Sequence, residues 1–290
     1  MADILRAIDP LEYYKSHLSA GVRPDGRGLL NGRKLARRSA NLNSTDGSAI
    51  IRLGKTTVLA GIQGEPTAPS EAEPSSGRIV ISVELPAICS PAAAGAHGSG
   101  GSVSGGGKLD REKAVLVELL QRTASGGLVS LDSLCIVEGV AVWSCYCDLV
   151  VLEHDGNLTD AAMLAMTCAL ASGRLPRVVA DAKNAGALTV MEEAAVPIRV
   201  AQPLYPCTFG VVGGVLVLDP CAEEETLSSS AFTVLVDGKG ELRAVHKPGG
   251  APLPDGSLAT CVDAARKRLP SLAAVLNKPL ATGSGAMSDP

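Results

Sequence analysis

The chain has 290 residues, and 46% of them are hydrophobic, so it can bury a substantial core as one large domain or two small ones. Its apolar stretches are all shorter than the roughly 20 residues that a membrane-spanning helix needs, and the opening MADILRAIDP lacks the apolar core of a secretory signal. The formal net charge of −4 argues against a protein that coats nucleic acid through bulk electrostatics. We therefore expect a soluble, intracellular protein that does not bind a membrane.

The eight cysteines raise the question of disulfides or a zinc site. Six of them stand alone among apolar or small residues, so we expect buried thiols in a reducing compartment. Cys145 and Cys147 are two positions apart, and on a strand this spacing places both side chains on one face. Zinc would need two further ligands at a suitable spacing, and no nearby His or Cys pair supplies them. The sequence predicts no metal site and no cofactor.

The N-terminal part of the chain is locally basic, with eight Lys and Arg against four Asp and Glu through Ala40. DPLEYYKSHLSAG predicts a short helix, because Asp9 can cap it, Pro10 suits its first turn and Gly21 follows as a stop. RPDGR (23–27) has the composition of a turn. The basic flank is either a local RNA-binding edge or a solvated, partner-facing surface.

Strand patterns follow over residues 37–63. SAIIRL and TTVLAGIQ flank Gly54-Lys55, which favours a hairpin with Gly54 at the first position of a type II′ turn. GRIVISVELP predicts a further strand, closed by Pro86. Residues 91–108 are rich in Gly, Ser and Ala and predict a flexible loop.

LDREKAVLVELLQRTASGG predicts an amphipathic helix, with apolar residues at 116, 119 and 120 and a stop at Gly126 and Gly127. LCIVEGVAVWSCYCDLVVLEHDG indicates one long strand or two, central in a sheet. LTDAAMLAMTCALAS predicts an apolar helix that lies on that sheet.

Strand patterns return in RVVA, PIRVAQPL, CTFGVV and VLVLDP, and FTVLVDGKGELRAV predicts a hairpin that turns at residues 237–240. GSLATCVDAARKRLPSLAAVLNK predicts a helix that Pro270 kinks or splits. The order of elements predicts an α/β (α+β) fold with mixed sheets and packed helices, built as two similar halves in one domain. This domain spans residues 1–280, and residues 281–290 are expected to be a disordered tail.

Four segments resemble the RNase PH family, and they are EYYKSHLSAGVRPDGR (12–27), VEGVAVWSCYCDLVVLEHDGNLTDAA (138–162), VVGGVLVLDPCAEEE (211–225) and ELRAVHKPGG (241–250). Within that family, DGNLTDAA is similar to the branch of RNA exosome core subunits that lack catalysis. The resemblance implies an RNase PH-like fold of two βαβ-type halves. It also implies a hetero-oligomeric six-membered ring of RNase PH-like subunits, S1/KH-type cap subunits, and RNA that passes through the channel.

Catalytic members of the family bind the attacking phosphate at a helix start, where a Gly-Thr-Arg or Ser-rich turn presents backbone N–H groups. The matching stretch here is DGNLTD, in which Leu158 and Thr159 take the place of the phosphate-binding residues and Asp160 follows. A carboxylate near the position of a cation disfavours a dianionic phosphate. The stretch fits a helix cap instead, with Asp155 or Asn157 as the capping residue.

The metal half of the family site is also altered. Catalytic members place one aspartate at the position of Glu225, a second at that of Ala231, and often a lysine at that of Thr233. Glu225 alone is a poor Mg²⁺ site, and Glu223 and Glu224 do not have the family's spacing. The resemblance therefore implies that neither a catalytic residue nor a metal ligand is retained.

RNA contacts are the last group of candidates. The loop that is rich in arginine in catalytic members has no Lys or Arg here between Pro91 and Gly107, which removes salt-dependent phosphate contacts. The remaining RNA-binding candidates are Arg33, Arg37, Arg38, Lys108, Arg111 and Arg122. On an amphipathic helix such cations are more often only solvated.

The leading hypothesis is a non-catalytic structural subunit of the exosome core ring that supports 3′-to-5′ RNA processing and degradation, including processing of ribosomal RNA. The resemblance implies the nucleus, including the nucleolus, and the cytoplasm. One alternative is a metal-dependent phosphorolytic exoribonuclease that uses Glu225 with Asp219 or Glu223. Another is a free RNA-binding module, which the 2% of aromatic residues and the acidic remainder of the chain disfavour.

Overall fold

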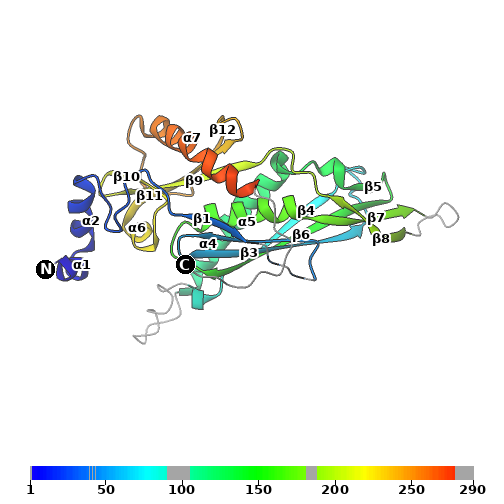
Figure 1. The fold of residues 1–290 in the computed structure, drawn as a ribbon, viewed down its shortest axis with the longest axis horizontal. Coiled ribbons are helices and arrows are strands. Elements are labelled where there is room, and N and C mark those ends of the chain that lie inside the picture. The colour runs from blue at the N-terminus through cyan, green and yellow to red at the C-terminus, as the bar shows by residue number, and fades with distance from the viewer. Residues whose placement is uncertain are drawn as a thin grey trace.

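A six-stranded mixed sheet and a four-stranded antiparallel sheet share one hydrophobic core (Figure 1). The computed structural model describes residues 2–38, 40, 42, 44–89, 105–180 and 188–277. The large sheet has the order β1-β2-β3-β6-β4, and β5 also pairs with β6. Its strands are β1 (Leu35–Arg38), β2 (Gly47–Leu53), β3 (Thr56–Thr67), β4 (Arg78–Glu84), β5 (Cys135–Val137) and β6 (Ala141–Glu153).

The large sheet forms as the sequence predicts. β2 and β3 are joined at Gly54, whose φ of +60° fits the first position of a type II′ turn. β6 is central, antiparallel to β3 and parallel to β4. The crossover between the two parallel strands includes the helix α4 (Gly105–Thr123), so β4, α4 and β6 form a βαβ unit.

Helix α5 (Leu158–Ser172) lies between the two sheets, in contact with β2 and β3 on one side and β9 on the other. Every side chain from Asp160 to Leu170 is buried, which explains why the apolar residues of this helix show no single stripe. Cys145 and Cys147 are buried in the same core, as expected for thiols on the inner face of β6.

The smaller sheet has the order β10-β9-β11-β12, and its described strands pair antiparallel. Its strands are β9 (Leu204–Val212), β10 (Val215–Leu218), β11 (Ser228–Asp237) and β12 (Leu242–His246). The short helix α6 (Ala222–Leu227) precedes β11, and the predicted hairpin joins β11 to β12. Helix α7 (Ser257–Leu276) packs on β9 and β11 and passes through Pro270 as one helix, so of the two expected effects of Pro270, a kink or a split, the split does not occur.

The two ends of the molecule carry smaller elements (Figure 1). Helices α1 (Ala2–Ile8) and α2 (Pro10–Ser19) lie at one end, and Asp9 accepts the N–H of Glu12 at 3.0 Å as the predicted cap. The opposite end holds the antiparallel pair β7 (Arg174–Ala180) and β8 (Leu188–Pro197). Short helical turns η1 (Ala87–Cys89), η3 (Ala124–Leu128) and η4 (Leu131–Leu134) connect the main elements.

Three expectations are corrected or fall outside the described residues. PIRVAQPL is mainly a connection between β8 and β9 with one bridge, Val200 to Val129, because its two prolines interrupt pairing. Helix α4 begins at Gly105, inside the segment predicted as a loop, whereas residues 90–104 lie outside the described residues, as does the predicted tail. Among the described helices, none has the length and hydropathy that a membrane span requires.

Candidate functional site

The acidic segment 219–225 lies between the end of β10 and the helix α6, next to the start of α5. Asp219 is fully buried, and its φ of +55° turns the chain away from β10. Few non-glycine residues adopt this conformation, and Asp and Asn are among those that do. The side chain of Asp219 therefore points into the protein, where the residues around it decide its chemistry.

Arg33 is the main partner of Asp219. Its backbone N–H donates to Oδ2 at 2.6 Å, and its guanidinium donates Nη2–H to Oδ1 at 2.9 Å. The same guanidinium donates to the carbonyl oxygens of Asp155 at 2.6 Å and Gly156 at 3.0 Å. Burial alone would raise the pKa of Asp219, but the hydrogen bonds and charge of Arg33 outweigh it and hold that pKa below its usual value.

Asn157 connects the start of α5 to the acidic segment. It caps α5 with φ of +53°, and its Nδ2 donates to Asp219 Oδ1 at 2.6 Å and to Asp160 Oδ2 at 2.9 Å. Its backbone N–H donates to Glu225 Oε1 at 2.6 Å. The carboxylate of Glu225 thus accepts the hydrogen bond from a backbone N–H at the positive end of α5. At this position the resemblance implies that catalytic members of the RNase PH family bind phosphate.

The preceding glycine allows this close approach. Gly156 has φ of +78°, and a Cβ there would lie 2.5 Å from the backbone of Cys221 and Ala222. Only glycine therefore lets the start of α5 lie directly against the acidic segment.

The three glutamates each have a different internal partner. Glu223 accepts Tyr14 Oη–H at 2.7 Å and pairs with Arg6. Glu224 is buried and accepts Arg23 Nε–H at 2.8 Å and the Cys221 N–H at 2.9 Å. Burial raises the pKa of Glu225 to about 7, although the bond from Asn157 opposes this rise.

The second position of the metal pair holds no ligand. Ala231 is on β11 opposite Gly210, and within the described part of the chain no group of three His, Cys, Asp or Glu converges as a metal site. Thr233 is buried, and its hydroxyl is 2.8 Å from that of Thr208, which donates to Asp160 Oδ1 at 2.7 Å. Ala231 and Thr233 therefore supply no carboxylate of the kind that a Mg²⁺ site uses.

The phosphate position of the resemblance is likewise remodelled. Leu158 and Thr159 begin α5 and are both half-buried. Asp160 is fully buried, accepts the Thr208 hydroxyl and lies 3.5 Å from Arg268 Nη1. Burial raises the pKa of Asp160, and the charge of Arg268 opposes this rise.

The predicted RNA-binding cations lie in different environments, and some are bonded inside the protein whereas others are exposed. Arg33 must be corrected to a structural residue, because its guanidinium is 9% exposed and bonded to Asp219. Arg37 donates to the carbonyl of Leu276 at the end of α7 at 2.6 Å. Arg38, Arg111 and Arg122 are exposed, and Arg122 pairs with Glu118 at 3.3 Å. Lys108 is in α4, and its side chain lies outside the described residues.

Sequence reasoning missed the arginines that bind the acidic segment. Arg23 is 1% exposed and also donates to the carbonyl oxygens of Leu218 at 2.7 Å and Asp219 at 3.1 Å. One signal was available: residues 200–238 contain no Lys or Arg. Because buried acids need cationic partners, the acids of this stretch are expected to pair with Lys or Arg from distant parts of the chain.

Comparison with known proteins gives matches over most of the chain. The RNase PH model, described as 3′ exoribonuclease family, domain 1, matches residues 31–176. The model described as 3′ exoribonuclease family, domain 2, matches residues 202–268. Together they cover both sheets and the acidic segment between β10 and α6.

Individual proteins are similar over nearly their whole length. Exosome complex component rrp43 of Schizosaccharomyces pombe is 29% identical over 265 residues, which is 91% of this chain and 94% of the relative. Exosome complex component Rrp42 of Methanopyrus kandleri is 31% identical over 268 residues, which is 90% of this chain and 95% of the relative. A structure described as the Archaeoglobus fulgidus exosome with RNA bound to the active site has a TM-score of 0.73 and 27% identity, with 94% of this chain and 97% of that chain covered.

Proposed function

Because the chain belongs to the RNase PH family, we propose that it is a non-catalytic structural subunit of an exosome core ring that supports 3′-to-5′ RNA processing and degradation. The family and the fold agree with the resemblance seen in its motifs. Similarity to rrp43 and Rrp42, both named exosome complex components, supports a place in such a complex. The narrower likeness of SCYCDL and HKPGG to ribosomal RNA-processing protein 43 is in line with the first of these relatives.

One observation carries the non-catalytic part of the proposal. Every carboxylate between Asp219 and Glu225 is bonded to a group of the protein itself, and Ala231 offers no second ligand. A metal or a phosphate would have to displace these internal partners, several of which are buried. Breaking such contacts leaves unpaired charges at a cost of several kcal/mol each, which disfavours the reaction.

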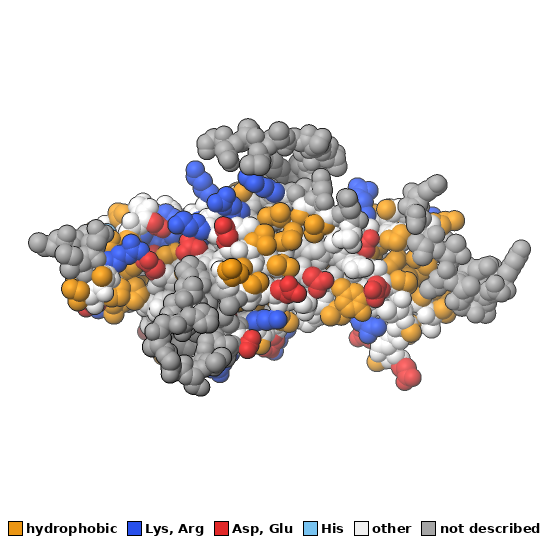
Figure 2. Space-filling view, turned by 90° about the horizontal axis from the view of Figure 1, so that it is seen from below, with side chains coloured by type: hydrophobic (Ala, Val, Ile, Leu, Met, Phe, Trp, Pro, Cys, Tyr) orange, Lys and Arg blue, Asp and Glu red, His pale blue; other side chains and the backbone are white. Residues whose placement is uncertain are grey.

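The outer face of the large sheet supports the structural part of the proposal. Residues on this face alternate with the core residues of β4 and β6, and Val80 and Leu152 are 40% and 45% exposed. Figure 2 shows hydrophobic side chains gathered in several places among charged ones on the lower side of the molecule. Exposed apolar patches with charged residues around them are typical of a surface that contacts another protein.

The partners in this proposal are other RNase PH-like subunits in a hetero-oligomeric six-membered ring, S1/KH-type cap subunits, and RNA in the channel. The proposed compartments are the nucleus, including the nucleolus, and the cytoplasm. Imaging of a tagged chain tests the compartments, and mass determination of purified complexes tests the ring.

Activity measurements on the assembled complex test the catalytic side. The chain is purified alone and in complex with RNase PH-like subunits, and each species is incubated with RNA, Mg²⁺ and inorganic phosphate. We expect a stable complex whose rate of nucleoside diphosphate release does not change when this chain carries Glu225→Gln. Glu241→Gln serves as the matched control, because Glu241 is an exposed acid outside the segment 219–225.

The runner-up is phosphorolysis by an altered acidic site built on Glu225 with Asp219 or Glu223. It predicts that the isolated chain releases nucleoside diphosphates and that Glu225→Gln abolishes the release. That result would overturn the non-catalytic proposal while leaving the family and fold intact.

A further inference from the structure

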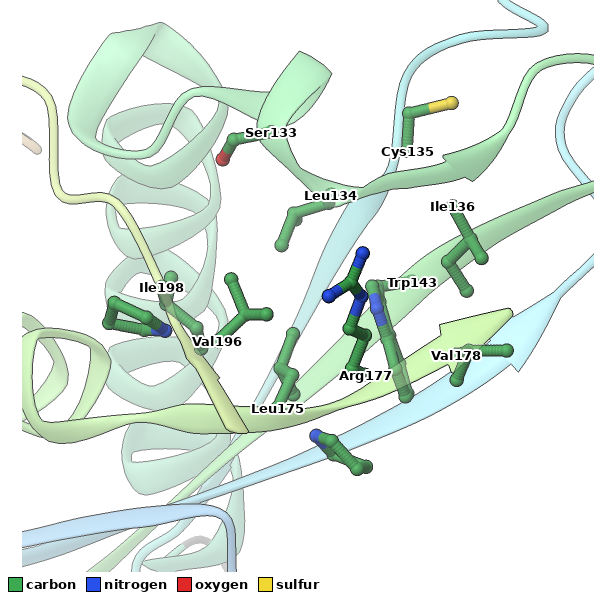
Figure 3. Close-up of a pocket in the computed structure, with 12 residues that line it drawn as sticks. Ser133, Leu134, Cys135, Ile136, Trp143, Leu175, Arg177, Val178, Val196 and Ile198 are labelled. Carbon is green, nitrogen blue, oxygen red and sulfur yellow. The ribbon is translucent and has the colours of Figure 1, made fainter. Parts of the chain in front are cut away.

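A cavity of about 150 Å³ opens between β5 and β7, at the far end of the molecule from the acidic segment (Figure 3). Its wall includes Leu134, Ile136 and Leu175, together with Trp143 of β6. The volume is below the range of about 300–1,000 Å³ that is usual for small-molecule sites. The cavity therefore fits one side chain of a larger partner better than a whole ligand.

Among the described residues, each strand beside the cavity has one edge without a partner strand, although the Arg174 N–H at the start of β7 donates to the Asp46 carbonyl. Among the described residues, β5 pairs only with β6, and β7 pairs only with β8. A two-stranded sheet such as β7-β8 is marginal by itself, and its Met191 and Val196 are 49% and 50% exposed. Strand edges without a partner strand, beside a cavity that can take a side chain, are the features with which proteins bind an extended peptide by strand addition.

The charge of the cavity indicates what such a peptide must carry. Among the described residues of the wall, Arg177 is the only charged one, and Figure 3 shows it pointing from β7 toward the space that Trp143 and Leu134 also line. Within the described part of the chain its guanidinium has no hydrogen-bond or ion-pair partner. Arg174 and Arg199 flank the lining segments, are exposed, and likewise have no side-chain partner there. A partner with a carboxylate complements this set of cations.

We propose that the cavity binds an extended segment of a partner protein, with an apolar side chain against Trp143 and a carboxylate against Arg177. Side chains two positions apart lie on the same face of a strand, so an apolar residue followed two positions later by Asp or Glu meets both requirements. The partner's main chain lies along the edge of β5 or β7. The inference does not depend on the proposed function, because it concerns a surface remote from the acidic segment.

Trp143 is the only tryptophan of the chain, so its fluorescence reports on this cavity alone. The probe is the capped peptide STLTEVS, in which Leu and Glu are two positions apart, and the full chain is titrated with it. We expect a saturable change in Trp143 emission and slower alkylation of Cys135, which also lines the cavity, with no change at Cys89. The peptide STLTQVS, which lacks the carboxylate, should bind at least about fivefold more weakly.

Charge reversal identifies the cation. Arg177→Glu should weaken binding of STLTEVS at least about tenfold and restore binding of STLTKVS. Arg38→Glu is the matched control, because it reverses an exposed arginine of β1 outside the cavity wall and should change binding less than threefold. Circular dichroism confirms that both variants are folded.

Two results would overturn the proposal. One is the absence of any response of Trp143 and Cys135 up to millimolar peptide. The other is a Trp143 response to an oligouridine that Arg177→Glu removes while peptide binding is unaffected, which would make the cavity an RNA contact.

Discussion

Arg33 and Arg177 show two opposite uses of the same side chain. Arg33 is enclosed near the start of α5, where it bonds to Asp219 and to two backbone carbonyls. Arg177 lies at the other end of the molecule, beside a cavity, and has no partner among the described residues. An arginine whose donors are used inside the protein holds the fold together, whereas one with free donors can bind another molecule.

The comparison explains how a segment rich in acids can have a structural role in the proposed function. Acids and bases are abundant around Asp219, but each is bonded to another part of the same chain. The charges join the N-terminal segment, the start of α5 and the end of β10. The acidic segment thus connects the end of β10 to the start of α5 and to the N-terminal segment.

The largest expected effect comes from breaking the most enclosed pair. In Arg23→Met, the buried carboxylate of Glu224 loses its main cation, and among the described residues only the Cys221 N–H and the more distant Arg27, at 3.9 Å, remain near it. Removing one partner of a buried ion pair costs about 3–5 kcal/mol. The free energy of unfolding from urea denaturation should fall by that amount.

The double variant Arg23→Met/Glu224→Met separates the cost of an unpaired charge from the loss of the pair itself. Because it removes both charges, it should be more stable than Arg23→Met alone. A single variant that loses less than about 1 kcal/mol would show that solvent reaches Glu224 and that the pair does not hold the fold together.

These pairs mark the limit of what the sequence could predict. The helix cap at Asp9, the hairpin at Gly54 and the apolar helix α5 depend on neighbouring residues, and all are present. The sequence alone shows that Ala231 cannot bind a metal, because an alanine side chain has no ligand atom. The partner of Asp219 could not be found, since Arg33 is 186 positions away and only the packed fold brings the two together.

A smaller effect is expected from the titration of Glu225. Burial raises its pKa from 4.5 to about 7, so the folded state binds more protons than the unfolded state between these values. The free energy of unfolding contributed by this group therefore falls as pH rises from 4.5 to 7. The free energy of unfolding of the native chain, relative to that of Glu225→Gln, should fall by on the order of 1–3 kcal/mol across this window. Denaturation in urea at several pH values measures it.

Glu223→Gln controls for the loss of an acid from the same helix. Burial raises the pKa of Glu223, but the bonds from Tyr14 and Arg6 lower this pKa by more than burial raises it, so the net shift is downward. Its contribution is lost only as pH falls below the usual glutamate range, and between pH 5 and 7 the difference should stay constant. Parallel curves for the two variants would contradict the assignment of the pH dependence to Glu225.

The smallest effect on stability is expected at the exposed arginines Arg177 and Arg122. Arg177→Ala should change the free energy of unfolding by less than about 0.5 kcal/mol, because its side chain has no bond to another described residue. Arg122→Ala is the control, since its exposed pair with Glu118 contributes little in water. If Arg177→Ala instead lost 2 kcal/mol or more, its guanidinium would be a packing element of the β7-β8 end. Arg177 would then have a structural role like that of Arg33, and the argument that it binds a carboxylate of a partner protein would be lost.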